Sequence, residues 1–533
     1  MTSHPWQLQF GAGVPPFVVS PDPSPGPTGD LSAAPGRRTG LGRGALALAA
    51  AAALAAGGGC IAEPVAPDAP SIEADPGLMP ASGGPPDMEA IVLEHRLWET
   101  FHDACDAAVR SLYGAAFAGS CDIERPHRRI IDADNHIAEY TVDVQVGPGA
   151  RDVIGLHRVV REKSRYRPAE LSEAVMLVHG DAWPFRGAFL DAPDRNTFAE
   201  FLAREGIDVW GIDLRWTRVP AGTADTSFMS AWGMEKDADD LGIALSIARV
   251  NRDLTREAPA HSAGSKIKLL GWSRGGQLAY AYAGRESQVP ILARRHVDGI
   301  IPVDIYLKTD LSTPEGQLRR DYACERLDVN LAQYNDTSRS DRYYSSLGSV
   351  ISALGGAALA DPTGASPILA GMSNRQAALL AGQATYLLED GRPPTPFYHL
   401  VGGTFDTNGL PVDLTYLTDE SRWFSVEAQA APYQPIKGLI DSERAMCGDP
   451  GPTIADHLGA ITVPVLYVGA GGGFGQSGVY TTTLLGSTDR SSIVQSAPAA
   501  GGQLGDIGHN DIFLADDAKD LFWNGIRDWI LAR

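Results

Sequence analysis

The sequence predicts an α/β fold, in which helices cover both faces of a mostly parallel β-sheet, with one large insertion. The first observation is a series of short apolar runs that alternate with helical segments from residue 174 onward. The second is that this alternation stops at about residue 308 and resumes at residue 461. The third is an amphipathic helix near the C-terminus. Because apolar runs separated by helices indicate βαβ units, we expect a parallel sheet that is buried on both faces.

The first 60 residues are not expected to join the folded core. Residues 1–36 are rich in Pro, Gly and Ser, a composition typical of disordered chain. Arg37, Arg38 and Arg43 then precede an apolar run over residues 45–56. A basic region followed by an apolar region of this length is typical of a signal peptide, and it is shorter than the roughly 20 residues that span a bilayer. We therefore predict a disordered leader and an export signal over residues 1–60.

The apolar run ends at Gly57-Gly58-Gly59-Cys60. Small residues before a cysteine resemble a bacterial lipoprotein processing site, which implies that Cys60 becomes a lipidated N-terminus. Residues 61–87 are Pro-rich and are predicted to form a tether. These patterns predict an exported protein: a periplasmic or cell-surface lipoprotein that contacts the membrane through its lipid anchor only, or a secreted protein.

Residues 88–307 are predicted to form the first part of the core. Apolar residues recur at helical spacing from residue 88 to about residue 112, and residues 136–147 and 153–160 alternate as the strands of a β-hairpin do. Further helices are predicted over residues 235–250 and 276–285. Four apolar runs indicate buried strands at 174–178, 207–212, 267–270 and 297–303.

Residues 308–460 interrupt this order. They contain Gly, Pro and scattered helical patterns, for example over residues 376–388. We interpret them as a cap or lid inserted over the carboxyl edge of the sheet, where ligands bind in such folds. Residues 461–533 return to the core, with a strand over 463–468 and an amphipathic helix over 518–530.

Four cysteines remain when Cys60 is set aside: Cys105, Cys121, Cys324 and Cys447. An even number in an exported chain indicates two disulfides, for which three connectivities exist. We expect neighbours along the chain to pair, Cys105 with Cys121 and Cys324 with Cys447. None of these cysteines has the spacing of metal ligands.

The composition also limits the classes of partner. A formal net charge of −21 argues against a nucleic-acid partner, because binding to phosphates depends on clustered Lys and Arg. No G-x-G-x-x-G motif follows directly on a predicted strand, and the sequence contains no P-loop and no H-E-x-x-H motif. We therefore expect a small-molecule substrate, no cofactor and no metal ion.

The segment Gly271-Trp272-Ser273-Arg274-Gly275 matches the pattern G-x-S-x-G. It lies between the apolar run 267–270 and a predicted helix from Gln277 onward. A five-residue match is weak alone, but this position between a strand and a helix makes it specific. A sharp turn from strand to helix holds a serine in strained backbone angles and raises its hydroxyl above the sheet. Glycines on both sides leave room for the turn. Ser273 is therefore the candidate nucleophile.

Residues 174–310 and 460–533 resemble the α/β-hydrolase superfamily, esterases and lipases especially. Beside the serine motif, Val178-His179-Gly180-Asp181 resembles the first oxyanion loop of the family, and Gly508-His509-Asn510-Asp511 resembles the loop that carries the catalytic histidine. The resemblance implies an α/β-hydrolase fold and a Ser–acid–His triad that works through an acyl-enzyme. A serine nucleophile favours acyl transfer over dehalogenation or epoxide opening, for which this fold uses aspartate.

His509 has the place along the chain that the resemblance implies for the general base. The family order is serine, acid, histidine, and His509 lies after the last predicted strand and before the closing helix. A neutral imidazole can accept the serine proton, and the resulting imidazolium can protonate the leaving group.

The acid is less directly indicated. Many family members carry it just after the strand that here is 463–468, but residues 469–474 contain no carboxylate. Another branch takes the acid from the end of the preceding strand, and this position is Asp304 here. Asp304 is our first choice and Asp489 the alternative. Asp310 and Asp506 follow them.

Two backbone N–H groups are expected to form the oxyanion hole. One belongs to Arg274, which follows the nucleophile, and the other to Asp181, with Ala182 as the alternate. Aromatic residues near the expected mouth of the site are candidates for an acyl pocket, although packing in the core or the cap explains each of them as well. These residues are Trp183, Phe185, Trp216 and Trp232.

The leading hypothesis is an exported serine hydrolase that cleaves a carboxylic ester. A peptidase or an acyltransferase would use the same triad. A surface-tethered binding protein on a degenerate hydrolase scaffold is the alternative from another class, and the missing carboxylate after residues 463–468 favours it. Ser273 and His509 in their expected contexts favour an enzyme.

Overall fold

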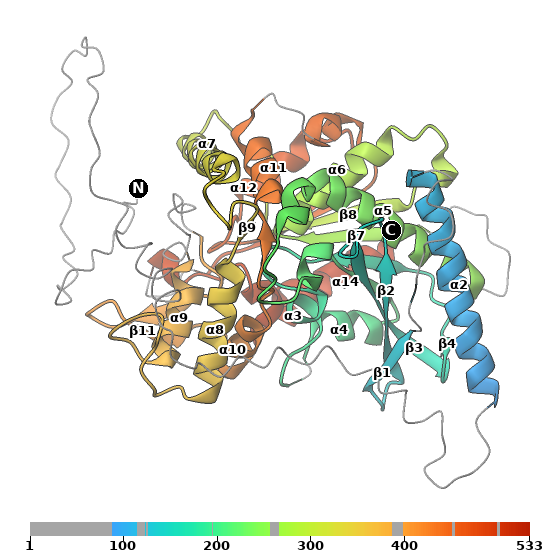
Figure 1. Ribbon diagram of the computed structural model, residues 1–533, viewed down its shortest axis with the longest axis horizontal. Helices are drawn as coiled ribbons and strands as arrows, with labels where there is room; N and C mark the ends of the chain where they lie inside the picture. Colours follow the sequence, from blue (N-terminus) through green and yellow to red (C-terminus); the bar gives the residue numbers. More distant parts are fainter. Residues whose placement is uncertain are drawn as a thin grey trace, which may run out of the picture.

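A ten-stranded sheet runs through the centre of the molecule, and helices cover both of its faces (Figure 1). The strand order is β1-β2-β3-β6-β5-β7-β8-β13-β14, and β4 pairs with β3. The leader, the signal and the tether predicted over residues 1–87 lie outside the described residues. This computed structural model describes residues 88–113, 123, 126–194, 196–255, 266–385, 398–449, 454–497 and 502–533.

The centre of the parallel part of the sheet is buried on both faces, as the apolar runs predict. In β5 the side chains of Val175 and Leu177 pack in the core on one face, and those of Met176 and Val178 pack in the core on the other. Every residue of β5, β6, β7 and β13 is buried. The six parallel strands are β5 (Ala174–Val178), β6 (Asp208–Asp213), β7 (Ile267–Trp272), β8 (Val297–Val303), β13 (Val465–Ala470) and β14 (Arg490–Gln495).

The strand order reverses at β5. β6 pairs with one side of β5 and β7 with the other, so the chain crosses the sheet in opposite directions on either side of this point. A crevice opens beyond the carboxyl ends of the strands at such a switch point, and ligands bind there. Residues 179–184 follow β5 and Ser273 follows β7 at this place.

The antiparallel part begins with the predicted hairpin, formed by β2 (Ile137–Gln145) and β3 (Val153–Ser164). β3 also pairs antiparallel with β6 and thereby joins the hairpin to the parallel strands. Two further strands, β1 (His127–Asp132) and β4 (Arg167–Pro168), were not indicated by the sequence. β1 has mostly polar side chains that are only partly buried, so it lacks the alternation that reveals a half-buried strand.

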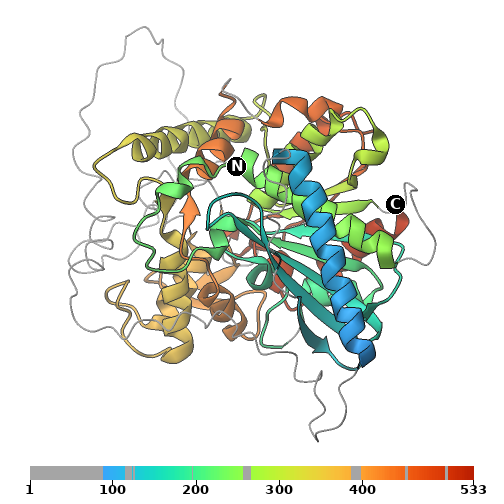
Figure 2. The same ribbon diagram turned by 45° about the vertical axis from the view of Figure 1, so that its right-hand side comes forward.

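The predicted N-terminal helix is present as α2 (Met88–Tyr113) and packs against α5 (Met234–Thr255), as Figure 2 shows. Phe101 and Ala104 of α2 belong to the same core as Leu241 of α5. α6 (Arg274–Ser287) contributes to this core too. The other face of the sheet is covered by α3 (Phe185–Phe189), α4 (Phe198–Arg204), α13 (Asp511–Leu514) and α14 (Asn524–Ala532).

The chain between β8 and β13 is mainly helical. The helix predicted over residues 376–388 starts at Asn374 and ends at Gln383. The helices α7 (Pro314–Asn335) and α11 (Ile436–Cys447) lie side by side, although about a hundred residues separate them in the chain (Figure 1). The remaining elements are α8 (Leu347–Ala360), α9 (Asn374–Gln383), α10 (Ser421–Ala428), the strand pair β9 (Tyr344–Ser345) and β12 (Gln434–Pro435), and the strand pair β10 (Gly403–Phe405) and β11 (Pro411–Leu414).

The helix predicted over residues 518–530 is present: a π-helical turn, Lys519–Trp523, continues directly into α14. β14 was not predicted, since its sequence Arg-Ser-Ser-Ile-Val-Gln contains only two adjacent apolar residues and gives no apolar run. The shorter elements are η2 (Arg215–Arg218), η3 (Ser227–Ala231), η5 (Leu292–Arg294), η7 (Ile454–Ala460), α12 (Ser477–Thr483) and η8 (Gly502–Gly505).

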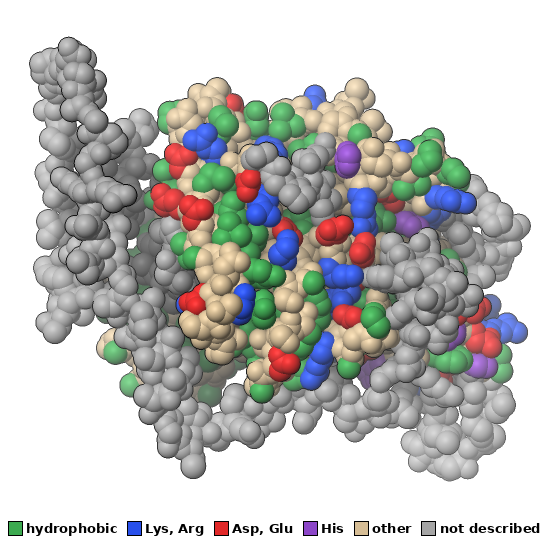
Figure 3. All heavy atoms as spheres, turned by 45° about the horizontal axis from the view of Figure 1, so that its top comes forward, with side chains coloured by type: hydrophobic (Ala, Val, Ile, Leu, Met, Phe, Trp, Pro, Cys, Tyr) green, Lys and Arg blue, Asp and Glu red, His purple; other side chains and the backbone are tan. Residues whose placement is uncertain are grey.

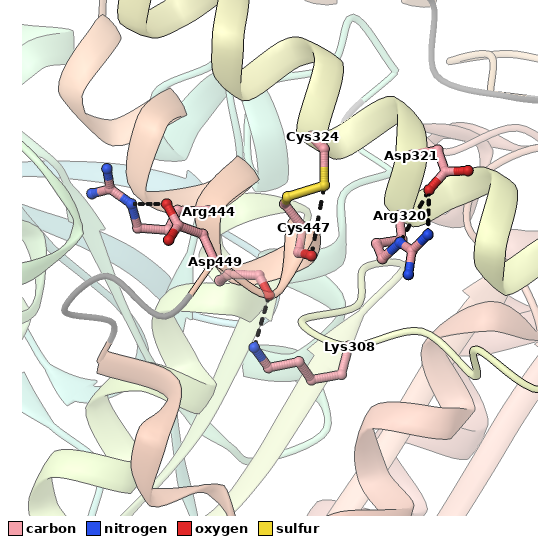
Figure 4. The surroundings of a disulfide bond; sticks show 8 residues. Lys308, Arg320, Asp321, Cys324, Arg444, Cys447 and Asp449 are labelled. Carbon is pink, nitrogen blue, oxygen red and sulfur yellow. Dashed lines mark hydrogen bonds and ion pairs between the residues drawn. A yellow bond between two sulfur atoms is a disulfide. The ribbon is translucent and has the colours of Figure 1, made fainter. Parts of the chain in front are cut away.

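A disulfide joins Cys324 of α7 to Cys447 of α11 (Figure 4), which confirms this predicted pair. The carbonyl of Ala445, beside the bridge, accepts a hydrogen bond from Lys308 Nζ (2.9 Å). Cys105 is buried and disulfide-bonded. Its predicted partner Cys121 lies outside the described residues, so that pairing stays a prediction.

Removing the bridge with the double substitution Cys324→Ser and Cys447→Ser should destabilise the protein. The bridge joins cysteines 123 positions apart, and the chain-entropy treatment assigns about 4–5 kcal/mol to a loop of that length, although measured values are often smaller. Thermal melts with and without reductant check this. Reductant should lower the melting temperature of the parent protein and leave that of the double variant unchanged. Equal melting temperatures for both oxidised proteins would contradict the expectation.

Charged side chains of both signs are mixed on the surface. On the face shown in Figure 3, Lys and Arg lie beside Asp and Glu. Exposed or half-buried ion pairs of the described residues include Arg375–Glu420 (2.7 Å) and Arg339–Asp341 (2.6 Å). None of the helices in the described part of the chain combines the length and the apolar character that crossing a bilayer requires.

The strand order, the helices on both faces and the turn between β7 and α6 together give the α/β-hydrolase fold. The mostly parallel sheet predicted from the sequence is therefore confirmed.

Candidate active site

Ser273 occupies a strained turn between β7 and α6. Its backbone angles are φ 56° and ψ −128°, a region that residues other than glycine rarely adopt. The neighbouring glycines are required by close backbone contacts. A Cβ atom on Gly271 would lie 2.0 Å from the carbonyl oxygen of Gly275, and one on Gly275 would lie 2.3 Å from that of Val178. The G-x-S-x-G pattern therefore forms the sharp turn that the sequence predicts.

His509 and Asp304 form a buried hydrogen-bonded pair. His509 Nδ1 lies 2.7 Å from Asp304 Oδ2, and both side chains are almost completely inaccessible. The other ring nitrogen, Nε2, has no hydrogen-bond partner among the described residues. Since an ionised carboxylate only accepts hydrogen bonds, this contact assigns the proton to Nδ1 and leaves Nε2 as the acceptor. His509 and Ser273 line the same cavity.

The glycine-rich segment after β13 surrounds the carboxylate of Asp304. Asp304 Oδ1 accepts hydrogen bonds from the backbone N–H groups of Ala470 (3.0 Å), Phe474 (3.1 Å) and Gly475 (2.9 Å). A Cβ atom on Gly473 would lie 1.7 Å from Asp304 Oδ2. The segment that lacks an acid thus holds the acid of the neighbouring strand, and its glycines allow that close approach.

The other carboxylates considered from the sequence are bound elsewhere. Asp489 is exposed and pairs with Arg533 (Oδ1–Nη2 2.8 Å), so it is not placed beside His509. Asp310 accepts hydrogen bonds from Ser312. The alternative acid, Asp489, is therefore not the partner of His509 in this structure. Arg533 binds it at the surface, just before β14.

Asp506 is buried, and its carboxylate binds groups other than His509. It accepts hydrogen bonds from Ser496 Oγ (2.7 Å) and from the N–H of Ala497 (2.7 Å). Its contacts stabilise the segment that precedes the His509 loop. Asp304 is therefore the candidate acid that contacts His509 in the described structure.

The loop of His509 is held by the chain between β8 and β13. The N–H of His509 donates to the carbonyl of His399 (3.0 Å), and the N–H of Asn510 donates to that of Leu400 (2.7 Å). Asp511 accepts from the N–H of Gly508 (2.7 Å), and burial raises the pKa of Asp511 to about 7. These contacts fix the position of the histidine backbone.

Aromatic side chains enclose the His509 ring. Trp272 stacks on it (ring centroids 4.9 Å apart), Tyr398 lies at 5.1 Å and Phe474 meets it edge-on at 5.9 Å. No pattern in the sequence indicated Tyr398 or Phe474, because they come from segments far apart in the chain. Their rings keep water from the buried His509–Asp304 contact, where hydrogen bonds are strengthened.

The loop after β5 passes directly beside the serine. A Cβ atom on Gly180 would lie 2.6 Å from that of Ser273, so only glycine fits there. His179 is buried and shapes the loop: its Nδ1 lies 2.8 Å from the carbonyl oxygen of Gly180, and its Nε2 accepts from the N–H of Leu214 (3.1 Å). Burial lowers the pKa of His179, which favours this neutral form.

Asp181 lies in the loop after β5, and Arg274 follows the serine directly in the chain. Arg274 is the first residue of α6, where an N–H has no acceptor within the helix. The two side chains form an ion pair, with Arg274 Nε 2.7 Å from Asp181 Oδ1 and Nη2 2.9 Å from Oδ2. This pair neutralises the Asp181 carboxylate and links the two loops. Ala182, the alternate, has a positive φ of 68°.

Ser273 and His509 open into a cavity of about 140 Å³. Its wall includes side chains from α7 and α11, the helices that the disulfide joins. Trp183 lines the cavity, as proposed from the sequence. The other three aromatics do not line it but pack in the cores: Phe185 on His157, Trp216 on His179 and Trp232 on Phe228.

In the described part of the chain, no cluster of three or more His, Cys, Asp or Glu side chains is placed to hold a metal ion. The arrangement offers a hydroxyl on a strained turn, an imidazole whose Nε2 has no partner among the described residues, and backbone N–H groups in the loops after β5 and β7. These are the parts that acyl transfer requires.

No protein-family model and no curated protein matches the sequence. Solved structures with similar folds include a Sulfolobus solfataricus protein thought to be a lipase, which is 16% identical with a TM-score of 0.46, covering 76% of this chain and 99% of that one. An esterase of Thermogutta terrifontis is 15% identical with a TM-score of 0.35, covering 74% and 98%. A proline iminopeptidase of Mycobacterium smegmatis is 14% identical with a TM-score of 0.33, covering 71% and 95%. At such scores these likenesses identify no function.

Proposed function

We propose that this protein is a serine hydrolase that cleaves carboxylic esters through an acyl-enzyme. The observation that carries the proposal is the shared cavity of Ser273 and His509, with His509 hydrogen-bonded to Asp304 at 2.7 Å. A degenerate binding protein has no need for a strained serine, a free imidazole nitrogen and a carboxylate held by three backbone N–H groups.

In the proposed reaction, Ser273 Oγ attacks the ester carbonyl carbon while its proton moves to His509 Nε2. The carbonyl oxygen becomes an oxyanion, which accepts hydrogen bonds from the N–H groups of Arg274 and of Asp181 or Ala182. The carbon–oxygen bond to the alcohol then breaks, and the imidazolium returns the proton to the leaving alkoxide. Water attacks the acyl-serine by the same sequence and releases the acid.

The size of the cavity suggests the length of the acyl group. An apolar cavity of about 150 Å³ holds one benzene ring, and the cavity beside Ser273 has about 140 Å³. We therefore propose that short acyl groups of up to about six carbons are preferred. Residues 308–460, which supply much of its wall, are proposed to act as the cap over the site.

Hydrolysis of p-nitrophenyl esters from acetate to decanoate tests the function, with p-nitroanilides of the same acids as the peptidase control. We expect ester cleavage with a maximum at short chains. Cleavage of the anilides at comparable rates would support a peptidase instead, and transfer of the acyl group to an added alcohol in preference to water would support an acyltransferase. No turnover of any of these compounds would contradict the proposal.

Export is part of the proposal and rests on the basic and apolar runs before Cys60. The disulfide between Cys324 and Cys447 supports it, because disulfides persist in oxidising compartments. If Cys60 carries the anchor, Cys60→Ser should move the protein from the membrane fraction to the soluble fraction of the exported material. Fractionation followed by immunoblotting measures the share of each protein in the two fractions. Cys105 is unchanged in both proteins. Unchanged membrane association would contradict the anchor at Cys60.

A further inference from the structure

Each arginine in the cavity wall pairs with a carboxylate. Arg326 of α7 donates from Nε to Glu443 Oε1 of α11 (2.7 Å). Arg319 of α7 pairs with Glu315 Oε1 (3.0 Å), which is not part of the wall. With the Arg274 pair described above, each of these guanidinium groups has a carboxylate partner. The wall therefore favours a neutral ligand over an ion.

Glu443 nevertheless has one carboxylate oxygen without a donor. The residue is 3% exposed, so water reaches it poorly. Its Oε2 is buried and accepts no hydrogen bond from any residue that the structure describes. A buried polar atom without a partner is costly, and such atoms call for an explanation. Because Glu443 lines the cavity, a ligand bound there can supply the missing donor.

Gln434 offers the complementary group in the same wall. It lies in β12, just before α11, and is 7% exposed. Its Nε2 is buried and has no acceptor among the described residues. Two other polar residues of the wall, Ser442 and Gln277, are bonded to each other: Ser442 Oγ donates to Gln277 Oε1 (2.5 Å). The wall thus leaves an acceptor on Glu443 and a donor on Gln434 for a ligand.

We propose that Glu443 and Gln434 form a specificity subsite for a neutral amide group on the ester substrate. The amide N–H donates to Glu443 Oε2, and the amide carbonyl accepts from Gln434 Nε2. An ammonium group fits less well, because Arg326 already neutralises Glu443. A plain alkyl chain leaves both buried polar atoms unbonded. The inference rests on the proposed function in that the same cavity binds the ester cleaved at Ser273.

Two esters of equal acyl length test the subsite. N-acetylglycine methyl ester contains the amide, and methyl pentanoate replaces it with methylene groups. Acid release is followed in a pH-stat, and the ratio of the two kcat/KM values is compared between proteins. We expect the parent protein to prefer the amide ester. Glu443→Gln should lower the ratio about tenfold, because it keeps the shape of the side chain but removes the charged acceptor.

The matched control is Glu315→Gln, which removes a carboxylate from an arginine pair on α7 without removing a group from the cavity wall. It should leave the ratio unchanged. Gln434→Leu is a second, independent variant and should lower the ratio about threefold. It decides the matter if Glu443→Gln does not fold. A ratio that is equal in the parent protein and in the folded subsite variants would overturn the subsite and leave the hydrolase proposal intact.

Failure of the proposed function gives a different pattern. The parent protein then hydrolyses neither ester, and the subsite is measured by calorimetric binding of N-acetylglycine methyl ester. Weaker binding to the Glu443→Gln protein than to the Glu315→Gln protein supports the subsite without catalysis. Equal binding to both proteins, or none to the parent, overturns it.

Discussion

Replacement of Ser273 by alanine is expected to abolish ester hydrolysis, with a loss of kcat on the order of 10⁶. Without Oγ no acyl-enzyme forms, and His509 has no hydroxyl proton to accept. The fold should persist, because alanine has the same Cβ atom and fits the positive φ no worse than serine. Steady-state kinetics with p-nitrophenyl butyrate measure the loss, and a thermal melt verifies folding.

Ser287→Ala is the matched control for this result. Ser287 lies at the other end of α6, where its hydroxyl donates to the carbonyl of Gly284 (2.5 Å). The control should retain activity within about threefold, as is typical of surface substitutions. Retention of full activity by the Ser273→Ala protein would show that another group performs the reaction.

Replacement of Asp304 by asparagine should reduce kcat by roughly 10³–10⁴ and keep the fold. The N–H groups of Ala470, Phe474 and Gly475 surround Oδ1 and require an oxygen there. The asparagine NH₂ group must then face His509 Nδ1. This favours the tautomer with the proton on Nε2, which cannot accept the serine proton, and it removes the charge that stabilises the imidazolium.

Asp489→Asn is the control for the acid, since Asp489 pairs with Arg533 at the surface. It should change kcat by less than about threefold. Both variants are compared with the same activated ester after a check of folding. An inactive Asp489→Asn protein beside an active Asp304→Asn protein would contradict the assignment of the acid. Two active proteins would indicate a Ser–His dyad or a different carboxylate.

The buried strands and the serine turn are predictable because their signals are local. Each run such as 174–178 is apolar throughout, and only strands covered on both faces need that composition. The glycines around Ser273 are required by contacts within the turn or with the adjacent strand. The choice of Asp304 combined a local feature, a carboxylate at the end of a strand, with the missing acid after β13.

The rest of the site depends on contacts between distant segments. Tyr398 and Phe474 both contact His509, although 75 residues separate them in the sequence. No periodic pattern indicates that contact. The ion pair between Asp181 and Arg274 likewise forms only when β5 and β7 lie side by side. β14 was missed because it is an edge strand whose polar side chains produce no apolar run.

The arrangement of α7 and α11 was predictable only through the cysteines. Their amphipathic patterns are interrupted by charged residues that face the cavity, such as Arg326 and Glu443. When a helix is predicted from its hydrophobic pattern, charged side chains are assigned to the solvent-exposed face. The predicted Cys324–Cys447 bridge was the one sequence feature that joined the two helices.

Labelling with a fluorophosphonate probe, followed by peptide mapping, tests the activated serine most directly. The nucleophilic oxygen attacks phosphorus and fluoride leaves, so the probe reacts with a serine that a neighbouring base activates. We expect one probe per chain, located on Ser273, in the folded protein, and none after heat denaturation or in the Ser273→Ala protein. An unlabelled folded protein, or a label on another serine, would contradict the account.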